Sequence, residues 1–235
     1  MAPYFVARHG FRDGCLVVAW SGDNPCSLAG LGLTLGDVAV SLGTSDTIFA
    51  VMERPQPGED GMVLRNPVEP SSYMGMLVFK NGALSREAVR REHCNGDWST
   101  WERMLSETPP GNGGAVGFYF HSPEITPSTG ERQGVFRYQH TEPVERFEAA
   151  TEVRAVVESK FLAMRGFARQ IGVDHVKRIV ATGGASENKG ILQVLSDVFG
   201  VKVYTLQQSD SASLGAAIRA LHGYRSASGS SRKES

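Results

Sequence analysis

A carboxylate and an amide follow the first apolar run of the chain. Residues 15–20 are almost wholly apolar, which predicts a buried strand, and Asp23 and Asn24 come just after it, where a short helix opens. Catalytic groups of open α/β sheets lie at such strand exits. Because a helix dipole favours an anion at its start, we expect Asp23 to stay ionised and to be able to accept a proton from a substrate hydroxyl. The residues alone also allow an ordinary turn in which Asp23 is the N-cap.

Two glycine-containing turns fall where predicted strands end. Gly43, Thr44 and Ser45 form the tip of a predicted hairpin, and the run from Gly183 to Ser186 joins a predicted strand to a helix. Backbone N–H groups in such turns can face an anion, and a helix start adds its dipole. Each turn alone is better explained as an ordinary connection. Neither has the spacing of GxGxxG or of the P-loop, which excludes the common nucleotide motifs.

Composition and charge restrict the class of protein further. Of 235 residues, 24 are Lys or Arg and 25 are Asp or Glu, so the formal net charge is −1. This balance disfavours nucleic acid or a membrane surface as the main partner. The three cysteines are widely spaced, and no Cys/His motif has zinc-ligand spacing. No apolar run is long enough to span a membrane and the start does not resemble a signal peptide, so we expect a cytoplasmic protein.

The candidate turns need a sheet to position them. Alternating or continuous apolar residues predict strands at 38–42, 48–52, 62–65, 73–79, 116–120, 178–182 and 201–206. Helical periodicity predicts helices at 83–91, 98–105, 143–171, 187–199 and 212–222. Antiparallel strands followed by a β-α-β-α order favour an α/β fold with a mixed sheet and helices on both faces. We expect a single domain over residues 1–223 and a disordered tail over residues 224–235.

Seven sequence blocks carry a more specific resemblance. They are GDNPCSLAG (22–30), SLGTSDT (41–47), FKNGALSRE (79–87), GNGGAVGFYF (111–120), EITP (124–127), ATGGASEN (181–188) and SLGAAIRA (213–220). In this order they resemble the C-terminal half of the FGGY carbohydrate kinases, most of all the xylulose kinase branch, over about residues 4–223. The resemblance implies an actin-like ATPase (ribonuclease H-like) fold with ATP and sugar in a cleft between two lobes. It also implies transfer of the γ-phosphoryl group of ATP, with Mg²⁺, to a hydroxyl of D-xylulose.

The resemblance assigns roles to most of the candidate residues. Asp23 would be the catalytic base, and Asp23 and Asn24 would contact the sugar. The turn at Gly43, Thr44 and Ser45 would be the family's second phosphate loop. The adenosine moiety of ATP or ADP would lie against three further residues, which are Gly184, Ala185 and Asn188.

Three features are open to a purely structural interpretation. Trp98 matches a nucleotide-lining position of the family, but a tryptophan that follows an N-cap such as Asp97 is more often a packing anchor. The glycine loop at 111–114 matches the family without an evident chemical role, and we interpret it as structural. Cys26 is interpreted as a small buried apolar residue.

The sequence also departs from the family pattern. It contains no Asp-x-Gly-Thr strand turn, which is the family's first phosphate loop, and nothing resembling the N-terminal sugar-binding lobe. That lobe is expected to supply the main Mg²⁺ ligand, so we assign no metal ligand in this chain.

Two hypotheses about function follow from these observations. The first is the C-terminal lobe of an ATP-dependent D-xylulose kinase that is inactive without its N-terminal partner lobe. The second is a non-catalytic nucleotide-binding domain with a regulatory role or from a truncated isoform. A purely structural glycine-rich domain would require both turns and Asp23 to be coincidental.

Overall fold

The alternating apolar residues of the first predicted hairpin pair as expected. In the computed structural model, which describes residues 1–19, 21–206 and 210–230, β1 (Asp37–Leu42) and β2 (Asp46–Met52) are antiparallel. Leu42 lies opposite Asp46, so residues 43–45 make the connecting turn. Val38, Val40 and Leu42 share one face of β1 and are buried in the core, as the period of two along a strand requires.

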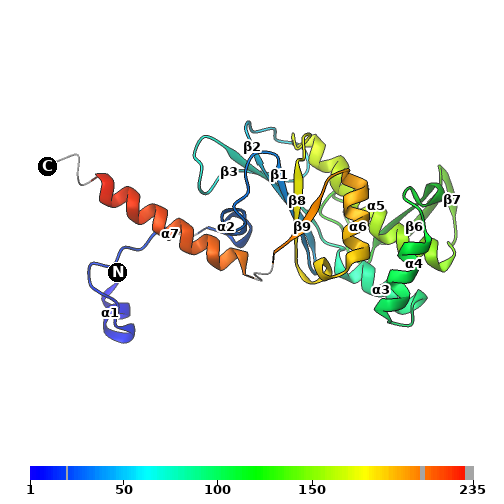
Figure 1. The fold of residues 1–235 in the computed structure, drawn as a ribbon, viewed down its shortest axis with the longest axis horizontal. Coiled ribbons are helices and arrows are strands. Elements are labelled where there is room, and N and C mark those ends of the chain that lie inside the picture. Colours follow the sequence, from blue (N-terminus) through cyan, green and yellow to red (C-terminus); the bar gives the residue numbers. More distant parts are fainter. Residues whose placement is uncertain (20, 207–209, 231–235) are drawn as a thin grey trace. The chain divides into compact units, whose positions relative to one another are not determined.

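Six strands form one mixed sheet in the order β3-β4-β2-β1-β8-β9 (Figure 1). The antiparallel half consists of β1 and β2 with β4 (Tyr73–Phe79) and β3 (Met62–Arg65). The parallel half consists of β1 with β8 (Arg178–Thr182) and β9 (Val203–Thr205). All six lie where the sequence predicts strands. β1 is thus the strand at which the two halves of the sheet meet.

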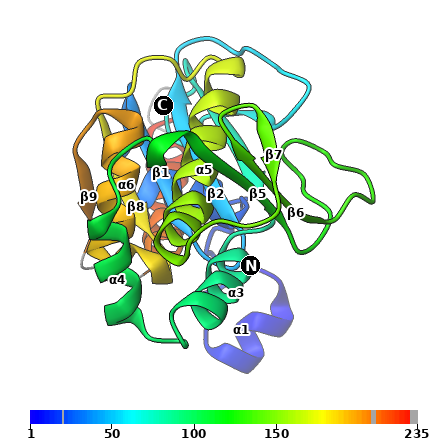
Figure 2. The same ribbon diagram turned by 90° about the vertical axis from the view of Figure 1, so that its right-hand side faces the viewer.

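One long helix organises the core beside this sheet. α5 (Ala149–Gln170) lies between the six-stranded sheet and a second sheet (Figure 1), and α3 (Ala83–His93), α4 (Trp98–Glu107) and α6 (Lys189–Phe199) pack around it (Figure 2). The second sheet is antiparallel and contains β5 (Ala115–Phe120), β6 (Gly134–Gln139) and β7 (Glu142–Val144). Short 3₁₀ turns lie at Asn112–Gly114 (η1) and Gly184–Glu187 (η2). The expected mixed α/β fold with helices is confirmed.

The start of α5 differs from the prediction because a strand competes with the helix. α5 was expected from residue 143, but Pro143 and Val144 pair with β6 as part of β7, so the helix begins only at Ala149. Its predicted end is correct, since Gly172 follows the C-cap residue Ile171 with a φ of 86°. The stretch 121–142, which showed no clear pattern, contains β6.

The chain divides into two compact units, and the expected domain over residues 1–223 stays a prediction. Unit 1 comprises residues 1–32, residues 66–70 and the chain from Asp210 onward, and unit 2 comprises residues 33–65 and the chain from Ser71 up to Asp210. In its described part, unit 1 contains α1 (Pro3–His9), α2 (Asp23–Gly30) and α7 (Ser211–Ser230) and no strand. α2 and α7 pack closely at Gly215, which has no side chain. The Cβ of an alanine there would lie 1.7 Å from the carbonyl oxygen of Cys26.

Two predictions for unit 1 need correction. The predicted strand at 15–20 is irregular backbone over its described residues 15–19, and Leu16 and Val17 are 55% and 70% exposed. A strand needs a neighbouring strand to accept its backbone hydrogen bonds, and the described part of unit 1 offers none. The predicted disordered tail also differs, since residues 224–230 continue α7 as helix, while 231–235 lie outside the described residues. None of the described helices is long and apolar enough to cross a membrane.

The start of β1 is tied to β8 by a charged pair whose effect on stability depends on pH. Asp37 is 3% exposed and accepts hydrogen bonds of 2.8 and 2.9 Å from the guanidinium of Arg178. Those bonds are the main reason that the pKa of Asp37 is lowered from 3.8 to about 2. A carboxyl group with a lowered pKa in the folded state stabilises the fold above its unfolded pKa and loses that effect as the pH falls.

We expect Asp37→Asn to unfold more easily than the wild type at neutral pH and equally easily near pH 2. The difference should be about 1–2 kcal/mol above pH 4, after allowance for the solvent exposure of Arg178, and should decline as the pH falls from about 4 to about 2. Urea unfolding at a series of pH values, followed by circular dichroism, measures it. The matched control is Asp174→Asn, at an exposed carboxylate. A difference that stays constant across this pH range would contradict the prediction.

Candidate functional site

The two glycine turns that the sequence predicts separately are neighbours in the structure. β1 and β8 are parallel, with Ser41 opposite Thr182, so the turns at 43–45 and 183–186 leave the sheet at the same edge. Gly183 packs against Leu42, the last residue of β1, because a Cβ added at Gly183 would lie 2.6 Å from the carbonyl oxygen of Leu42. Gly183 also has a φ of 83°, which disfavours any residue with a side chain. Ligands of open α/β sheets bind at the carboxyl ends of parallel strands, which is where both turns lie.

The hairpin turn presents N–H groups that find no acceptor within the described part of the chain. The backbone N–H of Ala83 donates to the carbonyl oxygens of Gly43 at 3.0 Å and Thr44 at 3.2 Å, so the carbonyl groups are engaged from the side of α3. No described residue accepts a hydrogen bond from the N–H of Thr44 or Ser45. Thr44 is exposed. Free N–H groups and a hydroxyl in one turn form a suitable receptor for an anion such as phosphate.

The second turn continues into a capped helix. η2 begins at Gly184 and Ala185, whose N–H groups are the ones that a helix start leaves without internal partners. Asn188 is the N-cap of α6, and its side-chain oxygen accepts a hydrogen bond of 2.9 Å from the N–H of Ile191. The Asn188 amide nitrogen is therefore the part of that side chain left to face a ligand.

A buried ion pair holds the hairpin turn in place. The guanidinium of Arg86 on α3 donates hydrogen bonds of 2.6 and 2.9 Å to the two carboxylate oxygens of Asp46, and one of 3.4 Å to the carbonyl oxygen of Gly43. Asp46 is fully buried and Arg86 is 4% exposed. The pair is bidentate, which fixes orientation as well as distance. Because Asp46 directly follows the turn, α3 determines where the turn's N–H groups point.

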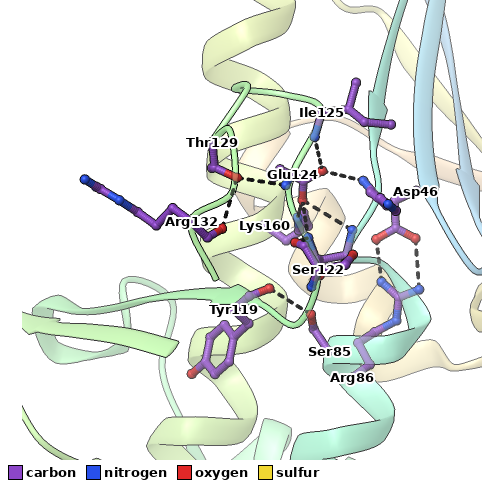
Figure 3. Close-up of polar contacts among 12 residues, drawn as sticks. Asp46, Ser85, Arg86, Tyr119, Ser122, Glu124, Ile125, Thr129, Arg132 and Lys160 are labelled. Carbon is purple, nitrogen blue, oxygen red and sulfur yellow. Dashed lines mark hydrogen bonds and ion pairs between the residues drawn. The ribbon is translucent and has the colours of Figure 1, made fainter. Parts of the chain in front are cut away.

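A second buried carboxylate fixes the segment that leads into α3 (Figure 3). Glu124 accepts hydrogen bonds from the backbone N–H groups of Lys80, Asn81 and Ile125, and from the ammonium group of Lys160 at 3.0 Å. The Asn81 side chain, which is fully buried, donates to Glu124 and to the carbonyl oxygen of Ser122. Burial by itself would raise the pKa of Glu124, but Lys160 and the backbone N–H groups outweigh it and lower that pKa. The carboxylate therefore remains charged and ties residues 80–82 to the 122–125 segment.

Asp23 and Asn24 lie in unit 1, at the start of α2. Asp23 is exposed and is the first residue of the helix, with Gly22 rather than Asp23 as the N-cap residue. Its carboxylate accepts a hydrogen bond of 2.8 Å from the N–H of Asn24. The helix predicted to start here is confirmed. Cys26 is 1% exposed, as expected for a small buried apolar residue.

The contacts of Trp98 and of the 111–114 loop are structural. Trp98 is 39% exposed, and its ring contacts the guanidinium of Arg90 at 4.5 Å and the ring of Trp101 at 5.7 Å. The predicted N-cap is confirmed, since the Asp97 carboxylate accepts a hydrogen bond from the N–H of Thr100. In the 111–114 loop, the N–H of Gly111 donates to the carboxylate of Glu158 on α5, which supports the structural interpretation of that loop.

Comparison with known proteins decides the family. The C-terminal domain of the FGGY family of carbohydrate kinases matches residues 38–224. The chain belongs to the FGGY family. Among curated relatives, it is 47% identical to xylulose kinase 2 of Arabidopsis thaliana, over 95% of this chain and 42% of the relative. It is also 47% identical to the xylulose kinase of Mus musculus, over 97% of this chain and 42% of the relative. The chain thus spans less than half the length of the curated relatives it matches.

Solved structures agree with the FGGY fold. The ligand-bound xylulose kinase of Lactobacillus acidophilus superposes with a TM-score of 0.77 at 17% identity, over 93% of this chain and 45% of that one. The glycerol kinase of Plasmodium falciparum with ADP gives 0.65 at 16% identity, over 84% and 40%. The expected actin-like ATPase fold is confirmed.

Four residues that hold the 43–45 turn and the segment before α3 were not identified by the sequence patterns. Asp46, Arg86, Asn81 and Glu124 all lie inside the resembling blocks, but no general motif marks them as a group. One signal is present in retrospect. Asp46 follows the predicted phosphate turn and begins a predicted buried strand, and a buried carboxylate requires a cationic partner. Arg86 is the only arginine in the following block, 79–87.

We expect Arg86→Ala to cost about 3–5 kcal/mol of unfolding free energy, because it leaves the charge of Asp46 buried and unpaired. The double variant Asp46→Ala/Arg86→Ala should lose less than the sum of the two single variants. Urea unfolding of the four chains of this cycle measures the coupling. Arg91→Ala, at an exposed position on the same helix, is the matched control and should change stability by about 0.5 kcal/mol or less. Additive losses would show that the pair does not act as a unit.

Adjacent glycines give a second test of the edge where the turns meet. Gly183→Ala should destabilise the chain by about 1–3 kcal/mol, because its Cβ meets the backbone of Leu42 at a positive φ. Gly184→Ala should be tolerated within about 0.5 kcal/mol, since a Cβ there has nothing within 4 Å. Thermal unfolding of the two variants and the wild type compares them. Equal stability of the two variants would contradict the close approach of the turns.

Proposed function

We propose that this chain is the nucleotide-binding half of an ATP-dependent D-xylulose kinase. The observation that carries the proposal is the position of two glycine turns at the same carboxyl edge of β1 and β8 in an FGGY chain. The choice of D-xylulose is supported by the 47% identity to relatives named xylulose kinases. In this proposal the reaction moves the γ-phosphoryl group of ATP to a hydroxyl of the sugar, giving D-xylulose 5-phosphate.

The turn at Gly43, Thr44 and Ser45 would hold phosphate oxygens. Its unpartnered N–H groups and the Thr44 hydroxyl are donors that the Arg86–Asp46 pair keeps in place before the nucleotide arrives. Phosphoryl transfer depends mainly on positioning and on stabilising charge spread over phosphate oxygens, and fixed donors provide both without reorganisation. The geometry of this turn suits that task.

The second turn would hold the adenosine moiety. Gly184 offers backbone that a flat ring can approach closely, since no side chain stands above it, and Ala185 and the Asn188 amide lie on the same turn. Trp98 keeps its proposed role as a nucleotide-lining residue, because its ring is partly exposed. The Arg90 guanidinium packs on one face of this ring, so the nucleotide would have to displace it or contact the other face.

Asp23 would act as the base, with Asn24 beside it on the sugar. A carboxylate at an exposed helix start is available to accept the proton of a substrate hydroxyl as the oxygen attacks phosphorus. The hydrogen bond from the N–H of Asn24 orients one carboxylate oxygen and leaves the other for the substrate. The sugar's remaining contacts are assigned to the N-terminal half of such kinases, the proposed partner of this chain.

Mg²⁺ would accompany ATP, with its main protein ligand outside this chain. Among the described residues, no group of three or more His, Cys, Asp or Glu side chains is arranged to hold a metal ion. The carboxylate nearest to the phosphate turn in sequence, Asp46, has both oxygens bonded to Arg86. The hydroxyl groups of Thr44 and Ser45 are the oxygen atoms that this turn could offer to a magnesium ion, whose role is to neutralise phosphate charge.

A complementation assay tests the proposed reaction. The purified chain should bind ADP in calorimetry but show no D-xylulose-dependent ATP turnover, because one half supplies only one side of the reacting geometry. Adding the N-terminal half of the mouse relative should produce turnover that Asp23→Asn abolishes. ADP binding without turnover in the complemented mixture would favour the alternative, a nucleotide-binding regulatory domain. Absence of ADP binding would contradict both.

Within that active complex, we expect Thr44→Val to lower kcat by about 10²–10³, because it removes a donor to charge that develops in the transition state. The KM for D-xylulose should change little, since the turn contacts phosphate rather than sugar. Steady-state kinetics with a coupled assay measure both constants. Thr205→Val, an exposed threonine on β9, is the control and should turn over like the wild type. Unchanged kcat in Thr44→Val would remove this residue from the phosphate site.

A further inference from the structure

Unit 2 contains a large cavity that includes neither glycine turn. It has a volume of about 620 Å³ and lies among β5, β6, α5 and the 126–132 segment. Its lining reaches Phe79 and Ser85 near the start of α3 but none of residues 43–45 or 183–186. Small-molecule sites in proteins have volumes of about 300–1,000 Å³, so this one could enclose a compact organic molecule.

One wall of the cavity is aromatic. Four aromatic residues line it, Phe118 and Phe120 from β5 and Phe136 and Tyr138 from β6. Phe118 and Phe120 stack with ring centroids 6.3 Å apart, and Phe136 and Tyr138 on β6 extend the cluster at 6.3 and 6.1 Å. Phe118 is 40% exposed. Partly exposed rings in contact form an apolar surface on which a flat ring can stack.

A buried hydroxyl in the lining has no partner. Thr126 is 2% exposed, and its Oγ1 makes no hydrogen bond to any described residue. The nearby Thr129 differs, because its hydroxyl donates to the carbonyl oxygen of Arg132 and accepts from the N–H of Glu124 (Figure 3). A buried hydroxyl without a partner costs about 1–3 kcal/mol, so its presence in a cavity wall indicates a missing hydrogen-bonding partner.

The uncompensated charge of the described lining is positive. Two cations line the cavity, Lys160 and Arg132. Lys160 is neutralised by Glu124, whereas the guanidinium of Arg132 has no ion pair with any described residue. In Figure 3 that guanidinium extends away from the Glu124 network. An anionic group on a ligand in the cavity would therefore find a free arginine.

We propose that this cavity is a binding site for a planar aromatic molecule that carries one anionic group. The rings of Phe118 and Phe120 would stack on the ligand, Arg132 would attract its anion, and Thr126 would exchange a hydrogen bond with a polar atom near its ring. The site is separate from the turns assigned to nucleotide, and it does not depend on the proposed kinase reaction.

Two fluorescent dyes with the same ring system probe the site on the full chain. One is 8-anilinonaphthalene-1-sulfonate, an aromatic anion, and the other is 1-anilinonaphthalene, which lacks the sulfonate. We expect saturable binding of both, with the anion bound more tightly. Ala163→Leu places extra carbon atoms in the cavity from α5 and should weaken both dyes by at least about tenfold. Saturating ADP should leave both dissociation constants unchanged.

Two milder variants test the anion contact of Arg132 and the hydrogen bond of Thr126 separately. Their results do not depend on whether Ala163→Leu folds. Arg132→Gln should weaken the anionic dye by about two- to fivefold and leave the neutral dye unaffected. Arg146→Gln, at another exposed arginine, is its matched control. Thr126→Val should weaken both dyes by about two- to tenfold while leaving the thermal stability of the empty chain equal or higher, because it removes an unpaired buried hydroxyl.

Three results would overturn the proposal. Wild-type binding of both dyes by all three lining variants would place the dye elsewhere on the chain. Equal weakening of both dyes by Arg132→Gln would exclude the assigned anion contact. Displacement of the dye by ADP would make the cavity part of the nucleotide site.

Discussion

The bidentate contact between Asp46 and Arg86 is the interaction on which the candidate site depends most. A hairpin turn whose N–H groups face solvent has many accessible conformations, and an anion receptor requires one of them. Both oxygens of Asp46 and the carbonyl oxygen of Gly43 are held by one buried guanidinium, so the turn is positioned from behind by α3. Placing a charged pair in the core carries a desolvation cost. The three hydrogen bonds of Arg86 offset part of that cost and hold the 43–45 turn in one conformation.

A second set of contacts explains why distant family blocks occur together. The Asn81 and Glu124 side chains join the segment before α3 to the segment after β5, and Lys160 joins both to α5. None of these side chains belongs to the two glycine turns. They orient the helix that carries Arg86, and through it the turn. A segment that resembles the family can therefore contain residues that hold a site in place as well as residues that contact a ligand.

The division of the chain into two units matters for the proposed chemistry. The candidate base, Asp23, lies in unit 1, and the candidate phosphate turn lies in unit 2. Phosphoryl transfer requires base, sugar and phosphate in line, to within fractions of an ångström. The chain spans less than half of its xylulose kinase relatives, and the remainder of such an enzyme would complete that geometry.

The sequence by itself determined most of the local elements and where the two glycine turns lie in the chain. Apolar patterns located β1, β2, β4 and β8, because strands that are buried along nearly their whole length need apolar residues whatever their neighbours are. The family blocks indicated the fold. Only the tertiary structure decided that the turns at 43–45 and 183–186 lie at the same edge of the sheet. Strand order is set by pairing between segments about 140 residues apart, which local patterns do not encode. The same reason accounts for the irregular backbone at residues 15–19, where the composition is apolar but the described part of unit 1 contains no partner strand. It also explains why local patterns did not single out Arg86, a charged residue of a predicted helix whose guanidinium bonds to Asp46 and Gly43.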